Sequence, residues 1–94
     1  MRATVLVRPK PGILDPQGQA VASALHHLGF DVGDARVGRL VELDLPTDDR
    51  MQALTELEQM CEQLLTNPLI ESYAIELDGR PVDGDAHAAP TEGA

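Results

Sequence analysis

The chain has 94 residues, the length of one domain, and 43% of them are hydrophobic whereas only 2% are aromatic. The core must therefore be aliphatic, and the scarcity of rings argues against a surface on which nucleic-acid bases stack. The formal net charge of −9 also disfavours binding to nucleic acid or to an anionic membrane, because phosphate groups repel a net acidic protein.

The first predicted strand is residues 3–7, ATVLV, which are rich in β-branched side chains and end shortly before Pro9. The loop that follows, residues 8–18, reads RPKPGILDPQG and contains three prolines. Proline fixes φ and so reduces the entropy that is lost when a loop becomes ordered. From the residues alone, the loop is either a stiff docking surface or a simple connection between strand and helix.

A helix is predicted over residues 17–29, QGQAVASALHHLG. Asp15 is its expected N-cap, and Pro16 suits the first helical position, where no backbone donor is needed. Gly29 is expected to end the helix. The apolar stripe at helical spacing consists of Val21, Ala24, Leu25 and Leu28.

Residues 31–45, DVGDARVGRLVELDL, contain signals for two strands. The first, over residues 32–37, is short and irregular, and Gly38 marks a turn or bulge after it. In the second, residues 41–45, apolar and acidic side chains alternate, as in a half-buried strand. Glu42 and Asp44 then lie on the solvent-exposed face of that strand, so no metal site or acid–base pair is needed to explain these two carboxylates.

A second helix is predicted after Pro46, with Thr47 as its N-cap, and Asn67 and Pro68 end it. Its expected buried stripe is Leu54, Leu57, Cys61, Leu64 and Leu65.

The last predicted strand is residues 69–77, after which Asp78 and Gly79 turn the chain. Residues 80–94, RPVDGDAHAAPTEGA, show no apolar periodicity, and we expect them to form a disordered tail. The predicted domain is therefore 1–79 and the tail 80–94.

The resulting order, βαββαβ, predicts an α+β, ferredoxin-like sandwich: a four-stranded antiparallel sheet in the order 4-1-3-2 with two helices on one face. Such a sheet leaves one face and two edges uncovered, and an apolar uncovered face invites a partner. We therefore expect the protein to oligomerise, at least as a dimer. The side chains expected on the uncovered face are Leu6, Leu40, Ile70 and Ala74.

No catalytic or metal site is predicted. Adjacent histidines on a helix, such as His26 and His27, point about 100° apart and do not chelate one metal. Cys61 falls in an apolar stripe, where a free cysteine behaves as a small hydrophobe, and the glycines form no phosphate-binding motif. Two classes of function fit: a subunit of a larger enzyme, or a small-molecule-sensing regulatory module, which would need a ligand cleft at a dimer interface.

The charge is unevenly distributed along the chain. Residues 1–41 hold five basic and three acidic side chains, a net charge of +2, whereas residues 42–94 carry −11.

A single cysteine excludes an intramolecular disulfide, and neither a signal peptide nor an apolar run of about 18 residues is expected. The simplest expectation is a cytoplasmic protein without membrane or nucleic-acid partners.

Four segments, VLVRPKPGILDPQGQAV, ALHHLGF, ARVGRLVELDL and MCEQLLTNPLIESYAIEL, together resemble the PurS family, the small subunit of phosphoribosylformylglycinamidine synthase. The resemblance covers residues 3–77, and it is specific in the combination of its motifs rather than in any one of them. One departure is Arg39, because the family commonly has lysine at this position; the change keeps the charge.

The resemblance implies a function without chemistry on this chain. A glutaminase subunit releases ammonia, and a large synthetase subunit, which uses ATP and Mg, condenses it with formylglycinamide ribonucleotide to give the amidine. The small subunit, as a homodimer or tetramer, joins the two and supports ammonia transfer between them. No cofactor is expected on this chain itself.

The resemblance also favours the docking alternative for the proline-rich loop. Arg8, Lys10 and Gln17 are the expected partner contacts, because a stiff loop loses little entropy on binding. Arg36 and Arg39, on either side of Gly38, are second candidates. Structural roles in loops and caps are expected for Pro9, Gly12, Asp15, Pro16, Gly38, Asn67 and Pro68.

Overall fold

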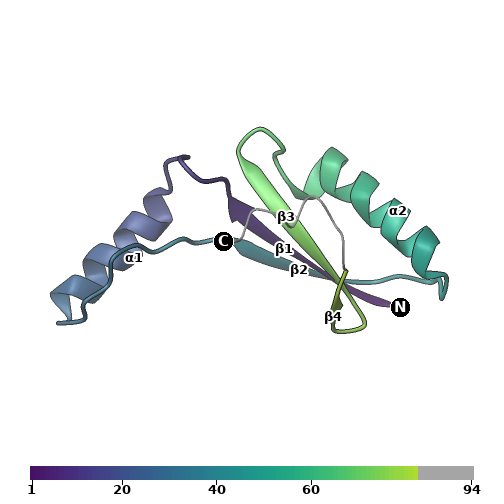
Figure 1. Ribbon diagram of the computed structural model, residues 1–94, viewed down its shortest axis with the longest axis horizontal. Helices are drawn as coiled ribbons and strands as arrows, with labels where there is room; N and C mark the ends of the chain where they lie inside the picture. Colours follow the sequence, from purple (N-terminus) through teal and green to yellow (C-terminus); the bar gives the residue numbers. More distant parts are fainter. Residues whose placement is uncertain (83–94) are drawn as a thin grey trace.

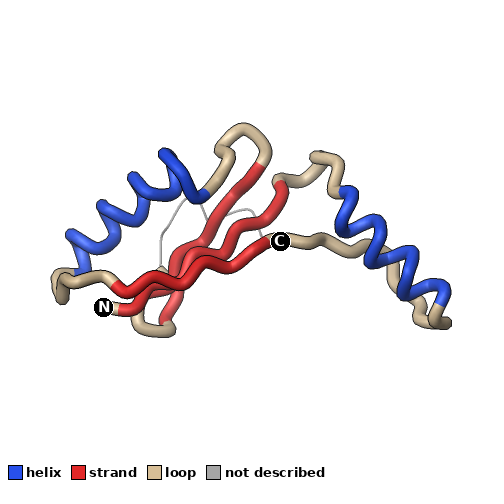
Figure 2. Tube along the Cα trace, turned by 180° about the vertical axis from the view of Figure 1, so that it is seen from behind, coloured by secondary structure: helices blue, strands red, loops and turns tan. Residues whose placement is uncertain are grey.

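Two antiparallel strands, β1 (Arg2–Pro9) and β3 (Glu71–Leu77), form the centre of the sheet. In this computed structural model, which describes residues 1–82, β2 (Arg39–Asp44) pairs with the other side of β1. The short β4 (Arg80–Pro81) pairs with β3. The strand order is therefore β2-β1-β3-β4, antiparallel throughout, and Figures 1 and 2 show the sheet from opposite sides.

The core lies on one face of this sheet, as the alternation of side chains dictates. Ala3, Val5 and Val7 of β1 are buried, whereas Thr4 and Leu6 between them are only half-buried. The composition of this core is almost wholly aliphatic, as predicted, with one tyrosine. Its remaining buried members are Leu45, Ala53, Leu57, Cys61, Tyr73, Ile75 and Leu77.

The helix α2 (Arg50–Met60) provides the cover for that face (Figure 1). Its N-cap is Asp49, whose carboxylate accepts hydrogen bonds from the N–H groups of Met51 and Gln52. The predicted cap, Thr47, is wrong by two residues. Its hydroxyl instead accepts from the Asp49 N–H at 3.0 Å and forms a local turn that delays the start of the helix.

A π-helical turn, η1 (Cys61–Leu65), continues α2 and changes which side chains face the core. The Thr66 N–H donates to the Cys61 carbonyl oxygen, five residues back, at 3.1 Å. A π-helical turn contains more residues than an α-helical turn. Side chains after Cys61 are therefore rotated away from the face of α2 that packs on the sheet. Leu64 is consequently 82% exposed, and the prediction that it is buried is wrong.

The four-stranded antiparallel sheet with two helices confirms the ferredoxin-like α+β class. One of the four strands, however, is formed by a different segment from the one that the sequence predicts. Residues 32–37 form no strand, because their backbone meets α1 and its N-cap instead of a sheet neighbour. The fourth strand is Arg80–Pro81, so the folded chain continues past the boundary expected at residue 79. The rest of the predicted tail, residues 83–94, lies outside the described residues.

The helix α1 (Pro16–His27) projects beyond the end of β1 rather than covering the sheet (Figures 1 and 2). Residues 28–37 return beside it, and we call α1 with these residues the α1 arm. Within α1 only Gly18 is buried, so the single chain differs from the expectation that both helices share one face. The chain is accordingly elongated, with extents of 48 × 24 × 22 Å.

Replacing Leu57 by alanine should lower the free energy of unfolding by about 2–5 kcal/mol, because a fully buried side chain is lost from the core. Leu64→Ala is the matched control. It removes the same side-chain atoms, but from an exposed position in η1, which directly follows α2. Its effect should stay within about 0.5 kcal/mol. Urea unfolding followed by circular dichroism measures both, and equal losses would contradict the rotation of Leu64 out of the core.

Candidate functional site

The base of the α1 arm is the candidate functional site. Here the loop after β1 leaves the sheet and the returning segment enters β2 (Figure 1). The structure brings to this base the five side chains for which the sequence predicts partner contacts, although they are far apart in the chain. They are Arg8, Lys10, Gln17, Arg36 and Arg39.

Asp15 joins the outgoing loop to the returning segment. Its Oδ1 accepts from the Gly18 N–H at 3.0 Å, so Asp15 is the N-cap of α1 with Pro16 at the first helical position, as the sequence predicts. Its Oδ2 accepts from the Val37 N–H at 2.9 Å, a contact that local sequence does not reveal. These backbone donors, Val37 first, hold the pKa of the Asp15 carboxyl below its ordinary value of 3.8.

Arg36 closes the base from the other side. Its Nη2 donates to the carbonyl oxygens of Pro9 at 2.9 Å and Lys10 at 3.0 Å. Further along the arm, a Cβ on Gly18 would overlap the Ala35 carbonyl oxygen, so the helix packs directly on the returning backbone. Arg36 therefore has a role within the chain in addition to the partner contact predicted for it.

Gly38 is required where the returning chain meets β1. A Cβ at this position would overlap the Val7 carbonyl oxygen, so any other residue would push the start of β2 away from the sheet. The structural role predicted for Gly38 thus has a steric cause. Gly12, in the outgoing loop, has a φ of +84°, in the region that favours glycine.

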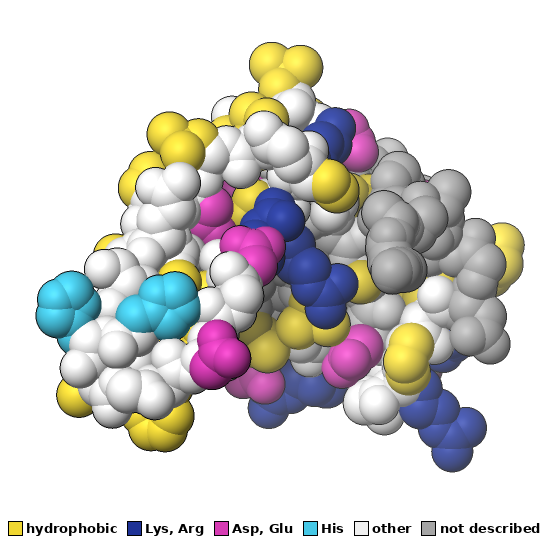
Figure 3. Space-filling model, turned by 60° about the vertical axis from the view of Figure 1, so that its left-hand side comes forward, with side chains coloured by type: hydrophobic (Ala, Val, Ile, Leu, Met, Phe, Trp, Pro, Cys, Tyr) yellow, Lys and Arg dark blue, Asp and Glu magenta, His cyan; other side chains and the backbone are white. Residues whose placement is uncertain are grey.

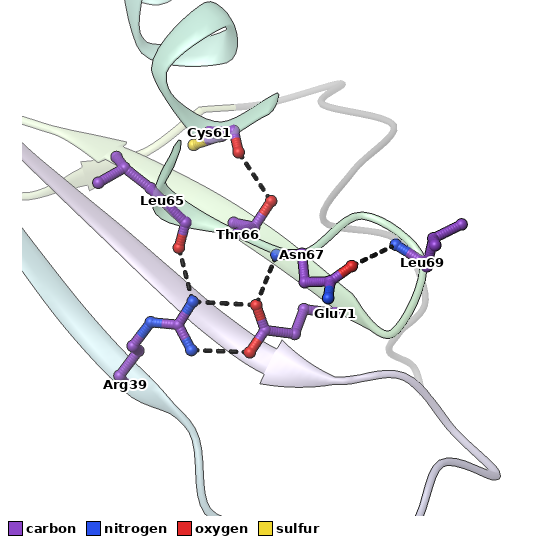
Figure 4. Close-up of polar contacts among 7 residues, drawn as sticks. All are labelled: Arg39, Cys61, Leu65, Thr66, Asn67, Leu69 and Glu71. Carbon is purple, nitrogen blue, oxygen red and sulfur yellow. Dashed lines mark hydrogen bonds and ion pairs between the residues drawn. The ribbon is translucent and has the colours of Figure 1, made fainter. Parts of the chain in front are cut away.

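Arg39 and Glu71 form a bidentate ion pair across the end of β1 (Figure 4). Arg39 Nη1 lies 2.7 Å from Glu71 Oε2, and Nη2 lies 2.9 Å from Oε1. Arg39 Nη2 also donates to the Leu65 carbonyl oxygen, and Glu71 Oε1 accepts from the Asn67 N–H at 2.7 Å. The pair therefore links β2 and β3 to the chain that leaves η1.

The hydrogen bond from Arg39 lowers the pKa of Glu71 below its ordinary value of 4.5, and the bond to Glu71 raises the pKa of Arg39. Sequence reasoning treats Arg39 as a free cation for a partner. The structure places its guanidinium in this pair, with 49% of the side chain still exposed. Its charge is thus largely balanced inside the chain.

The loop before β3 is fastened to the same base. Asn67 Oδ1 accepts from the Leu69 N–H at 3.2 Å, which shapes the turn at Pro68. Lys10 Nζ donates to the Pro68 carbonyl oxygen at 2.7 Å, and the Lys10 N–H donates to the Ile70 carbonyl oxygen at 2.8 Å. Lys10 thus serves as a clamp between two loops.

A groove of about 310 Å³ opens beside these contacts, and we call it the arginine groove. Leu6 and Leu40 are cross-strand partners on the uncovered face, as predicted, and they add apolar surface to it. Figure 3 shows Lys and Arg side chains gathered in a hollow with acidic side chains beside them. The lining residues are Leu6, Val7, Arg8, Pro9, Arg36, Gly38, Arg39 and Leu40.

A second groove, of about 350 Å³, adjoins the first, and we call it the loop groove. It is more apolar, since Ile13, Leu14 and Ile70 line it together with Gln17. Ile70 precedes β3 and belongs to this groove, so its predicted place on the uncovered sheet face is wrong; Ala74 does lie on that face, opposite Leu6.

Arg8 and Gln17 differ from the other three predicted contact residues. Both are exposed, and within residues 1–82 neither side chain makes a hydrogen bond or ion pair. Their polar groups are therefore available to a partner without breaking a contact in the chain. Arg8 lines the arginine groove and Gln17 the loop groove.

The base of the arm presents two grooves as contact surface. Across the described part of the chain, no three His, Cys, Asp or Glu side chains lie close enough to hold a metal ion, and no helix could cross a membrane. His26 Nε2 donates to the Val32 carbonyl oxygen, and His27 Nδ1 lies 3.1 Å from the Ser23 carbonyl oxygen. Both histidines thus make their contacts within the arm.

Comparison with known proteins places the chain among enzyme subunits. The family model PurS, described as phosphoribosylformylglycinamidine (FGAM) synthase, matches residues 2–79. The PurS subunit of phosphoribosylformylglycinamidine synthase from Synechocystis sp. is 43% identical over 74 residues, which is 78% of this chain and 74% of the relative. The corresponding subunit from Bacillus subtilis is 40% identical over 78 residues, 82% of this chain and 92% of the relative.

Solved structures share the fold. The crystal structure of Methanocaldococcus jannaschii PurS, one of the subunits of formylglycinamide ribonucleotide amidotransferase in the purine biosynthetic pathway, matches with a TM-score of 0.71 and 33% identity. The match covers 80% of this chain and 92% of that one. A chain in the PurLQS structure from Thermotoga maritima has the same fold, with a TM-score of 0.73, 24% identity and coverage of 86% and 95%.

Protonation of Asp15 and Glu71 should weaken the fold in acid. Both carboxyls have a pKa below the ordinary value in the folded state, so their stabilisation is complete above about pH 4.5 and is lost as the pH falls through the folded pKa. Glu71→Gln should therefore lower the urea midpoint at pH 7, and the difference from wild type should shrink toward pH 3. Exposed Glu42→Gln is the control, and a constant difference for Glu71→Gln would contradict the role of the ion pair.

Proposed function

This chain belongs to the PurS family and is a PurS subunit of phosphoribosylformylglycinamidine synthase in purine biosynthesis; we propose that it supplies contact surface to that enzyme. Release of ammonia from glutamine and the ATP-dependent step then take place on a glutaminase and a large synthetase subunit, and ATP and Mg bind to the latter. In this proposal the chain joins the two subunits and supports ammonia transfer between them. Such an assembly works in the cytoplasm.

The base of the α1 arm is the proposed docking surface, and its preformed geometry is the observation that carries the proposal. Three arginines and two leucines line the arginine groove, and backbone bonds to Asp15 and Arg36 hold that groove open. A surface that is rigid before binding loses little entropy when a partner docks. Arg8 and Gln17 are the side chains that reach the partner, whereas Lys10, Arg36 and Arg39 maintain the shape.

The partner surface should be acidic and apolar. Arg8 places a cation beside Leu6 and Leu40, and a carboxylate next to an aliphatic side chain complements this pair. Self-association as a homodimer or tetramer belongs to the same proposal, since the uncovered face and the edge strands remain available for a second copy.

Omission of the chain from a reconstituted enzyme tests this function. The glutaminase and synthetase subunits, mixed with glutamine, ATP, Mg and formylglycinamide ribonucleotide, should form amidine at least tenfold more slowly without this chain than with it. The chain alone should turn over neither glutamine nor ATP. An undiminished rate in its absence, or turnover by the chain alone, would remove the proposed role.

Charge reversal at Arg8 tests the docking surface. Arg8→Glu should weaken assembly with the two partners at least tenfold, because it sets a carboxylate against an acidic surface. Arg2→Glu is the matched control, since Arg2 is also an exposed arginine but lies at the opposite end of β1. Both variants should unfold within about 0.5 kcal/mol of wild type. Titration by light scattering measures assembly, and equal effects of the two variants would argue against the arginine groove.

A further inference from the structure

The base of the α1 arm is positively charged, although the whole chain has a formal net charge of −9 (Figure 3). The cations at this base are Arg8, Lys10, Arg36 and Arg39. Within residues 1–82, two carboxylates lie within ion-pair distance of these groups, those of Asp15 and Glu71. Four cations against two carboxylates leave an excess of positive charge, so the base attracts small anions.

Both of these carboxylates already have partners inside the chain. Asp15 accepts hydrogen bonds from two backbone N–H groups, and Glu71 is bonded to Arg39 and to the Asn67 N–H. Among the described residues that line the arginine groove, none is acidic. Arg8 makes no hydrogen bond or ion pair in the described part of the chain, so its charge is the one left unbalanced in the groove.

Two of the arginines keep N–H groups for a ligand. All five N–H groups of Arg8 are unused in the part of the chain that the structure describes. Arg36 Nη2 donates to the carbonyl oxygens of Pro9 and Lys10, whereas Arg36 Nη1 has no hydrogen-bond partner among the described residues. The bonds of Nη2 therefore hold this guanidinium in place before a ligand arrives. Planar guanidinium groups pair well with the oxygens of a phosphate.

The arginine groove also has an apolar wall. Leu6 and Leu40 form this wall as cross-strand partners, and Leu40 is 55% exposed. The groove volume of about 310 Å³ falls within the usual range of small-molecule sites, about 300–1,000 Å³. A free phosphate ion leaves the two leucines in water, whereas the carbon skeleton of a phosphate ester covers them.

The acidic side chains of the uncovered sheet face lie away from this groove. Glu42 and Glu76 are the cross-strand neighbours of Thr4, which precedes Arg8 by four residues in β1. Four residues of a strand span about 13 Å. Exposed charges at such a separation are largely screened at physiological ionic strength. The two glutamates therefore repel an anion at Arg8 only weakly.

We propose that the arginine groove binds the phosphate group of a small phosphate monoester. Arg8 and Arg36 Nη1 donate to the phosphate oxygens, and the organic part of the ligand covers Leu6 and Leu40. The phosphate takes the place at Arg8 that a carboxylate of the partner takes in docking, so ligand and partner exclude each other. This exclusion rests on the proposed function, whereas the binding itself concerns the chain alone.

Titration of the full chain with ribose 5-phosphate tests the site. Backbone amide NMR signals of Val7, Gly38 and Leu40 should shift and reach saturation at millimolar ligand at pH 7. Ribose, which lacks the phosphate, should leave these signals in place, and inorganic phosphate should bind more weakly because it does not cover the leucines. Shifts no larger than those with ribose would overturn the site, and an equal affinity for inorganic phosphate would overturn its assignment to a monoester.

Removal of one arginine distinguishes a defined site from general attraction to a basic surface. Arg8→Gln should weaken the binding of ribose 5-phosphate about tenfold, because a charged hydrogen-bond donor is lost. Arg2→Gln is the matched control: it removes the same charge at the opposite end of β1, and its affinity should stay within about twofold of wild type. Equal losses in the two variants would refute the groove as the binding site.

Competition with the partner subunits tests the exclusion. Saturating ribose 5-phosphate should weaken assembly of the wild-type chain with the glutaminase and synthetase subunits, measured by light scattering. The residual assembly of Arg8→Gln should not respond, which separates an effect on this chain from an effect on its partners. Unchanged wild-type assembly with a ligand that binds the chain would overturn the exclusion. Full assembly of Arg8→Gln without ligand would instead contradict the docking surface, so the two failures are distinguishable.

Discussion

The two hydrogen bonds that converge on the carboxylate of Asp15 are the constraint on which the shape of this protein depends. One carboxylate oxygen caps the N-terminus of α1 by accepting a hydrogen bond from the Gly18 N–H. The other oxygen accepts a hydrogen bond from the Val37 N–H of the returning chain. Buried or half-buried backbone donors must find an acceptor, and here the acceptor is a side chain rather than a neighbouring strand. The returning chain therefore follows the helix and joins the sheet only at Arg39. The projecting arm, the late entry of β2 into the sheet and the grooves at the base all follow from that choice.

The molecule divides its tasks between two regions. The core of β1, β3 and α2 holds nearly all of the fully buried apolar side chains and therefore most of the stability. The arm and its base contribute little burial, but they hold polar groups in fixed positions through Asp15, Arg36 and the Arg39–Glu71 pair. A region that is rigid yet poorly buried is suited to binding, because its shape exists before the partner arrives.

In the proposed function, the chain takes part in a reaction through the surface that it offers to other subunits. In the function proposed here, nitrogen released on one chain is joined to a substrate on another, and such transfer depends on how the chains are held. Prolines in the loop after β1 and the bonds of Lys10 to the loop before β3 limit movement at the base. The predicted contact residues thus fall into two groups: those that hold the surface, and those, Arg8 and Gln17, that face outward from it.

The sequence by itself determined the features that depend on near neighbours. Alternation placed β1 and most of β3, and the Asp15–Pro16 pair marked the start of α1. Scarce aromatics required an aliphatic core, and the combined motifs indicated the family. Only the tertiary structure decided that residues 32–37 follow a helix, that a π-turn turns Leu64 outward, and that Arg39 binds Glu71. The first and the third of these outcomes depend on which remote donor and acceptor meet, and local spacing carries no information about that. The π-turn depends on a single bond between Thr66 and Cys61, which the helical periodicity of the sequence does not reveal.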